Sequence, residues 1–334
     1  MTTPVRFGLI GAGAIAGAHI EALQSLGNLA QCVGIHDLDS TAAQAMAEKV
    51  GCPSFQNLED FLEQAKPDAV ILCTPPSTHA PLAMAMMERG ISVLCEKPLS
   101  IRPENARAML AAADAAGVVF TMASKFRYVE DVEAARKLIQ EGTIGEVVLL
   151  ENTFAARVDM KGRWNATPEV GGGGVLMDNG THSADIVRYL LGPVHEVQAT
   201  EGNRFQKLDV EDTVHLFLRS EAGVMASIDL SWSINKQLDY YIGIYGTEGI
   251  IRIGWQESFY ERPSNGGKHV FGRGYSKLNA FASQLRNFIG AMRGTEELRI
   301  SPVEALDSVE VIAAAYRSLD DNDWATVAPA HATH

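Results

Sequence analysis

The sequence predicts an α/β protein in which a doubly wound parallel sheet is followed by an α+β domain with an open, mainly antiparallel sheet. Three observations lead to this fold class. Up to about residue 124, short apolar runs alternate with helix-length segments, as in parallel sheets covered by helices on both faces. Glycines stand where those helices would end. Beyond residue 124 the apolar residues alternate with period two, which is typical of an antiparallel sheet with one buried face.

The first domain, residues 1–124, is expected to bind a dinucleotide and contains five apolar runs rich in Val and Ile. The runs are 5–10, 30–36, 69–74, 91–96 and 118–123. Their nearly continuous hydrophobicity indicates strands that are buried on both faces. The helical segments between them end at Gly27, Gly51, Gly90 and Gly117, where glycine can adopt the left-handed conformation of a helix terminus.

The second domain, residues 125–334, is expected to bind substrate. A helix over 132–140 precedes long strands. In the segment 224–232, Val224, Ala226, Ile228, Leu230 and Trp232 alternate with mostly polar residues, so one face of that strand is apolar. Helices near 281–292 and 302–319 are expected to close this domain, and the tail from residue 325 is expected to be frayed. Two domains also agree with the length of 334 residues.

The composition restricts the partners that the chain is expected to bind. The 28 Lys and Arg residues against 41 Asp and Glu residues give a net charge of −13, which repels nucleic acid and anionic lipid. Cys32, Cys52, Cys73 and Cys95 show no Cys-x-x-Cys spacing and are expected to be buried free thiols in a reducing compartment. No apolar stretch reaches transmembrane length. We therefore expect a cytoplasmic protein without nucleic-acid or membrane partners.

A glycine-containing turn follows the first predicted strand and precedes the first predicted helix. It reads Gly11-Ala-Gly13-Ala14-Ile15-Ala16. The first glycine would permit the tight turn, the second would let the backbone approach a pyrophosphate, and the small Ala16 would allow close helix packing. Such a string also occurs as a packing turn. Its position at the start of a strand–helix–strand unit favours a dinucleotide site with Gly11, Gly13, Ala14 and Ile15 as contacts.

Asp37, at the end of the second predicted strand, favours NAD over NADP. A carboxylate there can accept hydrogen bonds from the ribose 2′-hydroxyl, whereas it would repel a 2′-phosphate. The segment 36–43 contains no Arg or Lys that would bind that phosphate. The alternative is that Asp37 caps the following helix, although Asp39 or Ser40 can fill that role instead.

Thr74, Pro75, Pro76 and His79 follow the predicted strand 69–74. They stand at the carboxyl edge of the sheet, where doubly wound folds bind their ligands. The two prolines would form a rigid apolar wall beside a nicotinamide ring. A plain strand-to-helix turn, with His79 as a residue of the next helix, is the alternative.

The next predicted strand ends in Glu96-Lys97-Pro98. Lysine is rarely buried, and this one stands at the same sheet edge beside a proline that fixes the backbone. A cation held there would stabilise an alkoxide and hold a substrate hydroxyl against the nicotinamide. A solvated lysine at a strand end is the alternative. We assign Glu96 to the cofactor site, and Lys97 to catalysis and to both binding sites.

The segment 171–185 carries the candidate acid–base group. Four glycines, 171–174, precede an apolar-periodic helix and suggest the close approach of another body. Asp178 and His182 are four residues apart and share one helix face, with Gly180 leaving room for a ligand. Histidine exchanges protons near neutral pH, and a carboxylate one turn away can orient the ring or bind a substrate hydroxyl. A surface pair is one alternative; a metal site lacks a third ligand.

Substrate contacts are expected from two further segments. One follows the last parallel strand and includes Tyr128, and the other is the loop before the glycine run, where Arg157, Lys161 and Arg163 would suit a carboxylate or phosphate near Asn165. A solvated loop is the alternative. The predicted substrate contacts are Lys97, Lys125, Arg127, Arg157, Arg163, Trp164, Asp178, Asn179 and His182.

Together these motifs resemble the glucose–fructose oxidoreductase, inositol dehydrogenase and rhizopine-catabolism (Gfo/Idh/MocA) family. The similarity spans nearly the whole chain, from the glycine turn through Thr-Pro…His79, Glu96-Lys97-Pro98 and Gly-Thr-Ile-Gly-Glu-Val (142–147) to Gly-Gly-Gly…Asp178-x-Gly-x-His182. The resemblance implies a Rossmann domain and an open second sheet that is often used to form a homodimer or homotetramer. It also implies a cis bond before Pro98.

The resemblance further implies that Lys97, Asp178 and His182 match the catalytic positions of the inositol dehydrogenase branch. Asn179 and Thr181 fill motif positions that are often apolar, which suggests a distinct substrate. The expected reaction is NAD-dependent oxidation of a sugar or polyol (an inositol, aldose, sugar acid or nucleotide sugar). Two alternatives keep the fold: a redox-neutral glycosidase that uses NAD, and a non-catalytic sugar or cofactor sensor.

Overall fold

The structure, a computed structural model, describes residues 3–263 and 267–329. The chain forms two compact units. Unit 1 comprises Met1–Lys125 and Lys277–Ala305, and unit 2 comprises Phe126–Ser276 and Leu306–His334. Unit 1 contains a six-stranded parallel sheet and unit 2 a mixed, mostly antiparallel nine-stranded sheet, so the predicted fold class is confirmed.

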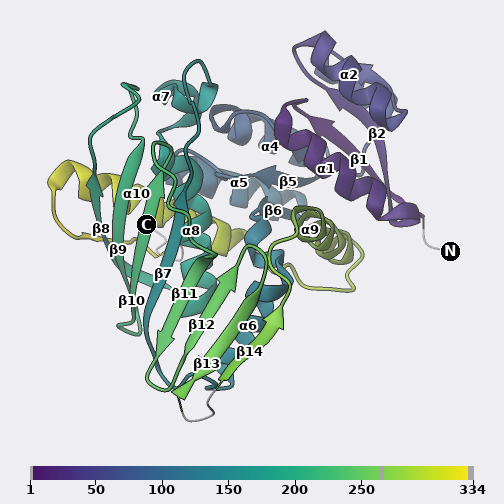
Figure 1. Cartoon of the computed structure of the whole chain (residues 1–334). Helices are drawn as coiled ribbons and strands as arrows, with labels where there is room; N and C mark the ends of the chain where they lie inside the picture. Colours follow the sequence, from purple (N-terminus) through teal and green to yellow (C-terminus); the bar gives the residue numbers. More distant parts are fainter. Residues whose placement is uncertain (1–2, 264–266, 330–334) are drawn as a thin grey trace. The chain divides into compact units, whose positions relative to one another are not determined.

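The sheet of unit 1 has the strand order β3-β2-β1-β4-β5-β6 with parallel pairing throughout (Figure 1). All five predicted apolar runs form strands, and most of their residues are buried. The short β3 was not predicted, because two residues are too few for a hydrophobic pattern. The strands are β1 (Val5–Ile10), β2 (Ala30–His36), β3 (Ser54–Phe55), β4 (Ala69–Leu72), β5 (Ser92–Glu96) and β6 (Phe120–Ala123).

Helices connect these parallel strands. Gly51 and Gly117 form left-handed C-caps of α2 and α5, and Gly27 and Gly90 also have positive φ, as their positions in the sequence predicted. The helices of unit 1 are α1 (Ala14–Ser25), α2 (Ser40–Val50), α3 (Leu58–Ala65), α4 (His79–Met87), α5 (Pro103–Ala116) and α9 (Lys277–Met292).

Helix α9 lies outside the boundary that we drew at residue 124. It packs against α1, and Phe281, Leu285 and Phe288 are buried in the same apolar cluster as Phe7 of β1. The rings of Phe7 and Phe288 are 6.1 Å apart between centroids. Residues 277–305 therefore belong to unit 1 and not to the second domain, because the apolar stripe of α9 completes the core on that side of the parallel sheet.

The sheet of unit 2 has the order β14-β13-β12-β11-β7-β10-β9-β8-β15. The pairing of β7 with β10 is parallel, and the remaining pairs of described strands are antiparallel. The elements are α6 (Glu130–Gln140), β7 (Val147–Ala155), α7 (Pro168–Gly171), α8 (Val175–Leu191), β8 (Val194–Glu201), β9 (Thr213–Ser220), β10 (Met225–Ser231), β11 (Tyr240–Gly246), β12 (Ile250–Gly254), β13 (Ser258–Arg262), β14 (Gly267–Gly272), α10 (Pro302–Asp321) and β15 (Ala325–Thr326).

One face of this sheet is covered by helices. Helix α8 packs on β7, β9 and β10, and α6 packs on β12 and β14. Ala226, Ile228 and Leu230 are buried, which confirms the predicted alternation along β10. On β9 and β10, Phe217 and Met225 point to the opposite face of the sheet and remain 40% and 44% exposed.

The end of the chain differs from the expected frayed tail. Ala325 and Thr326 form β15, which pairs with β8, and the Val327 amide donates to the His195 carbonyl at 2.9 Å. Residues 330–334 lie outside the described part. Within 3–263 and 267–329, no helix combines the length and the apolarity needed to cross a membrane.

Candidate active site

The turn between β1 and α1 requires glycine at its first position. Gly11 has φ of 98°, and its amide donates to the His36 carbonyl at 2.8 Å. A Cβ at Gly11 would lie 2.7 Å from the carbonyl carbon and oxygen of Cys73. The fold itself therefore explains this glycine.

Gly13 shows a different constraint. Its φ of −73° suits any residue, and a Cβ there would meet no described atom within 4 Å. Among the described residues, no side chain caps the N-terminus of α1, where Ala14 is exposed and Ile15 half-buried, while Ala16 is fully buried. An open helix terminus beside an unfilled position is what a pyrophosphate requires. The residues present thus fit a dinucleotide.

Asp37 is held beside this turn. Its Oδ2 accepts a hydrogen bond from the Ala12 amide at 2.6 Å, and its Oδ1 accepts one from the Asp39 amide at 2.8 Å. The N-cap of α2 is Asp39, whose carboxylate accepts from the amides of Thr41 and Ala42. Asp39 therefore caps α2, and the carboxylate of Asp37 is not needed for that purpose.

His79 connects two loops at the carboxyl edge of the parallel sheet. Its Nε2 lies 2.9 Å from the Thr74 carbonyl oxygen and its Nδ1 lies 2.9 Å from that of Pro98. The side chain is fully buried, and burial lowers its pKa. Both ring nitrogens contact the backbone, so His79 fixes these loops and offers no ring nitrogen to a nucleotide. Pro75 is half-buried and Pro76 is buried.

Glu96 forms a buried pair that the sequence did not indicate. Its Oε1 lies 2.7 Å from His19 Nε2 on α1, and its Oε2 accepts the Lys97 amide at 3.1 Å. Burial by itself would raise the pKa of Glu96, but the hydrogen bond and charge of His19, with the charges of Lys97 and Lys125, lower it overall. Glu96 therefore anchors the backbone of Lys97, next to the cis Lys97–Pro98 bond.

Lys125 belongs to the same edge of unit 1. Its Nζ lies 5.8 Å from the centre of the Phe281 ring, and that ring meets His19 edge-on with centroids 4.7 Å apart. Helix α9 thus contributes to the surroundings of the Glu96 pair.

In unit 2, Asp178 and His182 lie on α8 as predicted. His182 is 7% exposed, and its ring meets the ring of Phe126 edge-on at 5.0 Å between centroids. Asp178 and Asn179 are half-buried, and Asn179 Nδ2 donates to the Phe154 carbonyl at 3.4 Å. The helix therefore places the carboxylate and the imidazole on successive turns, with an apolar ring against the imidazole.

The glycines before α8 are explained by protein contacts. A Cβ at Gly174 would lie 2.0 Å from the Glu211 carbonyl oxygen, and one at Gly173 would lie 1.8 Å from the Tyr316 hydroxyl. The close approach that we predicted is therefore that of Glu211 and Tyr316. Gly180 is buried, and a Cβ there would come within 3.3 Å of Leu230 and Ile312 side chains, so core residues fill the space that we expected for a ligand.

Glu211 caps the N-terminus of α8. Its Oε1 accepts hydrogen bonds from the amides of Gly174 and Leu176 at 2.8 and 3.1 Å and from the Tyr316 hydroxyl at 2.8 Å. Burial raises the pKa of Glu211, and these hydrogen bonds offset the rise only in part. The helix that carries Asp178 and His182 therefore starts at a buried carboxylate.

Two family models match the chain over this architecture. One, described as an oxidoreductase family with an NAD-binding Rossmann fold, matches residues 5–124, and the other, the Gfo/Idh/MocA C-terminal domain, matches residues 132–252. The chain belongs to the Gfo/Idh/MocA oxidoreductase family. The predicted resemblance is confirmed.

The relatives of this Gfo/Idh/MocA protein include several named dehydrogenases. Inositol 2-dehydrogenase of Rhizobium meliloti is 29% identical over 97% of this chain and 99% of its own length. A 1,5-anhydro-D-fructose reductase of Ensifer adhaerens is 31% identical over 73% of this chain and 74% of its own length. The solved WlbA dehydrogenase of Bordetella pertussis, in complex with NADH and UDP-GlcNAcA, is 27% identical with a TM-score of 0.86, over 98% of this chain and 99% of that one.

Arg127 has a structural contact in this family member. Its Nε donates to Asp185 Oδ1 of α8 at 2.8 Å, and both side chains are buried. Tyr128 beside it is also buried. The prediction that Arg127 binds substrate gains no support from this position, because a buried pair of this kind holds the segment onto α8.

The loop before α7 is solvent-exposed. Arg157, Lys161 and Arg163 are exposed, and Trp164 is 45% exposed at the start of a short 3-10 helix, Trp164–Ala166. Asn165 is half-buried. The assignment of these residues to substrate binding stays a prediction.

Sequence reasoning missed an aromatic cluster behind His182. The Phe126 ring stacks on Tyr275 at 5.4 Å, and the Trp255 ring lies 4.5 Å from Tyr241 and 5.8 Å from Tyr275. The hydroxyls of Tyr241 and Tyr275 are buried without a hydrogen-bond partner in the described part of the chain. These aromatic residues come from separate strands and loops, so no local pattern connects them.

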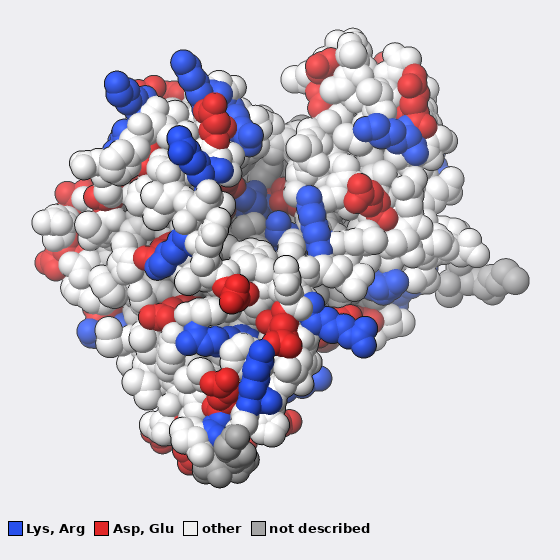
Figure 2. All heavy atoms as spheres, in the orientation of Figure 1, with Lys and Arg blue, Asp and Glu red and all other residues white. Residues whose placement is uncertain are grey.

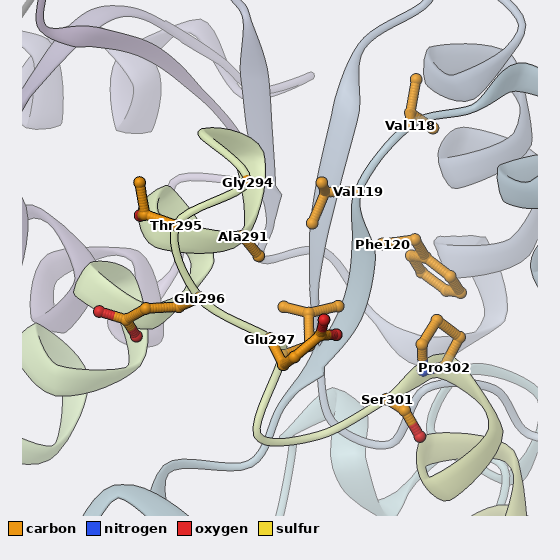
Figure 3. A pocket seen from close by; sticks show the side chains of 11 residues that line it. Val118, Val119, Phe120, Ala291, Gly294, Thr295, Glu296, Glu297, Ser301 and Pro302 are labelled. Atoms are coloured by element: carbon orange, nitrogen blue, oxygen red, sulfur yellow. The ribbon is translucent and has the colours of Figure 1, made fainter.

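A cavity of about 520 Å³ in unit 1 lies at the amino end of β6, not at the carboxyl edge of the parallel sheet (Figure 3). Phe120 at the start of β6, the preceding Val119 and the segments 294–298 and 301–302 line it. Glu296 also lines it (Figure 3) and accepts a hydrogen bond from Asn287 Nδ2 at 3.0 Å. Ligands of doubly wound sheets bind at the carboxyl ends of the strands, so this cavity is not the dinucleotide site.

The surface charges form no large field of one sign on the face in view. Figure 2 shows basic and acidic side chains interspersed there. Across 3–263 and 267–329, no group of three or more His, Cys, Asp or Glu residues is placed to hold a metal ion.

Proposed function

We propose that this chain is a dehydrogenase that transfers hydride between a CH–OH carbon of a sugar or polyol and the nicotinamide of NAD. The observation that carries the proposal is the carboxylate–imidazole pair on α8, in a chain whose α1 terminus fits a pyrophosphate. The named relatives act on inositol or on sugar derivatives, which supports the substrate class. The individual substrate among inositols, aldoses, sugar acids and nucleotide sugars is part of the test.

Each candidate catalytic residue has a distinct role in this proposal. His182, whose ring meets that of Phe126 edge-on, removes the hydroxyl proton. Lys97, whose backbone Glu96 holds, donates to the developing alkoxide. Asp178 orients His182 or binds the neighbouring hydroxyl. NAD, when bound, supplies the hydride acceptor.

The aromatic cluster of unit 2 supports a sugar or polyol as the substrate. Trp255 is 41% exposed and is continuous with the rings that contact His182. Aromatic faces contact the CH faces of sugar rings, and the unpartnered Tyr241 and Tyr275 hydroxyls are groups for which a hydrogen-bond partner is expected.

Asp37 supports NAD over NADP in this proposal. Its carboxylate is fixed beside Ala12, where it would accept from ribose hydroxyls and repel a 2′-phosphate. Asp37→Ser should therefore lower the ratio of turnover with NAD to turnover with NADP.

We further propose a cytoplasmic homodimer or homotetramer assembled through the sheet of unit 2. Phe217 and Met225 are exposed on the face opposite α8, where a second copy would cover them. Light scattering of wild type and of Met225→Glu tests this, and a monomeric wild type would contradict it.

The function is tested by NAD reduction across a panel of inositols, aldoses, sugar acids and nucleotide sugars. With a substrate that the wild type oxidises, His182→Ala should lower kcat by roughly 10²–10⁴-fold and leave the NAD dissociation constant unchanged. His195→Ala is the matched control, because His195 is exposed on β8. Unchanged turnover of His182→Ala would remove His182 from the mechanism, and no NADH with any substrate in the panel would count against a dehydrogenase.

A further inference from the structure

Two of the four cysteines lie in contact. The Sγ atoms of Cys32 and Cys52 are 3.8 Å apart, and both residues are half-buried free thiols. Cys73 and Cys95 are buried instead, with exposed fractions of 8% and 0%. The expectation of four buried free thiols is therefore wrong for the burial of the first pair.

The backbone holds this pair together. Gly51 ends α2 in the left-handed conformation, and the Cys52 amide donates to the Ala47 carbonyl, which turns the chain back toward β2. Beyond the turn, the Ile35 amide of β2 donates to the Pro53 carbonyl at 3.1 Å. Cys52 is thus fixed from both sides beside the strand that carries Cys32.

We propose that Cys32 and Cys52 form a reversible disulfide by exchange with a low-molecular-weight disulfide. The Cys52 thiolate attacks one sulfur of the oxidant, forms a mixed disulfide and releases one thiolate. Cys32, after losing its proton to solvent, attacks the Cys52 sulfur and displaces the second thiolate. The protein loses two electrons and two protons, and one oxidant molecule becomes two thiols.

The geometry requires only a small movement. Sulfur atoms in a disulfide are about 2 Å apart, so rotation of the two side chains has to close roughly 2 Å. Partial exposure lets an oxidant reach the pair, which the buried Cys73 and Cys95 do not permit.

The electrostatics assign the attacking group. The hydrogen bond from the Cys32 thiol lowers the pKa of Cys52, which increases the thiolate that reacts. Burial raises the pKa of both Cys73 and Cys95, so these two thiols stay protonated and serve as internal controls.

The proposal is tested on the full chain with oxidised glutathione. Intact-mass analysis should show a product lighter by two hydrogen atoms, and peptide mapping should join the peptides that contain Cys32 and Cys52. Dithiothreitol should restore the original mass. Cys32→Ser should stop at a stable glutathione adduct on Cys52, while Cys52→Ser should give no internal crosslink.

Three outcomes overturn the proposal. In the first, the wild type keeps the glutathione adduct without closing the crosslink; in the second, crosslinks form only between molecules. In the third, the wild type stays unmodified by oxidised glutathione although its thiols react with an alkylating reagent. Circular dichroism of both serine variants controls for folding. The readout is covalent and does not depend on enzymatic activity, so it stands apart from the proposed function.

Discussion

The carboxylate of Glu211 serves three donors at the start of the helix that carries Asp178 and His182. One oxygen, Oε1, accepts from the amides of Gly174 and Leu176 and from the Tyr316 hydroxyl, and the side chain is 4% exposed. Glu211→Ala leaves these three donors without their acceptor in a buried position.

The size of the effect follows from those three donors. Each orphaned buried donor costs about 1 to 2 kcal/mol, so Glu211→Ala is expected to lower the free energy of unfolding by about 3 to 6 kcal/mol. Glu211→Gln keeps an amide oxygen in place of Oε1 and should stay within about 1 kcal/mol of wild type. Tyr316→Phe removes one donor and should cost about 1 kcal/mol.

The pH dependence gives a second signature. Because burial raises the folded-state pKa of Glu211 above its ordinary value of 4.5, folding favours the protonated carboxyl. Its contribution to stability is therefore fully present below pH 4.5 and is lost as the pH rises through the folded-state pKa. Glu211→Gln cannot titrate, so the stability of wild type relative to this variant should fall as the pH rises.

Urea unfolding followed by circular dichroism, at several pH values, measures both effects. Glu211→Ala should shift the midpoint strongly, and Glu211→Gln should restore it. If the alanine variant unfolds within 1 kcal/mol of wild type, or if the glutamine variant is as unstable as the alanine variant, the shared-acceptor account of Glu211 fails. Turnover should follow the same order if α8 carries the catalytic pair.

Three further predictions concern other parts of the chain. Gly13→Ala should keep the melting temperature, because the new methyl meets no described atom within 4 Å, but should weaken NAD binding on the order of tenfold or more. Calorimetry measures both the melting temperature and the NAD affinity, and an unchanged NAD affinity would contradict the role of Gly13 in phosphate binding. Gly11→Ala, with φ of 98°, should lower the melting temperature instead. The hydrogen bond from His215, with the charge of Lys236, lowers the pKa of Asp229 from 3.8 to about 2, so its contribution to stability is present above pH 3.8 and lost as the pH falls toward 2. The free energies of unfolding of wild type and Asp229→Asn, measured during acid titration, should therefore converge in that window, and parallel curves would refute this account.

The sequence predicted the parallel sheet, the dinucleotide turn and the candidate residues of α8. These features have local signatures: strands buried on both faces read as continuous apolar runs, the turn places Gly11 and Gly13 within three positions, and Asp178 and His182 share a helix face by spacing alone. The assignment of Lys97, Asp178 and His182 to catalysis stays a prediction that rests on the motifs.

Tertiary structure decided what surrounds those residues. Glu96 reaches His19 across 77 positions, and Glu211 reaches Gly174 across 37. Tertiary structure also placed α9 in unit 1 and brought the sulfur atoms of Cys32 and Cys52 into contact. Periodicity shows that a residue faces the interior, but the partner it meets there depends on which elements pack together, and that is set by the summed burial of distant segments.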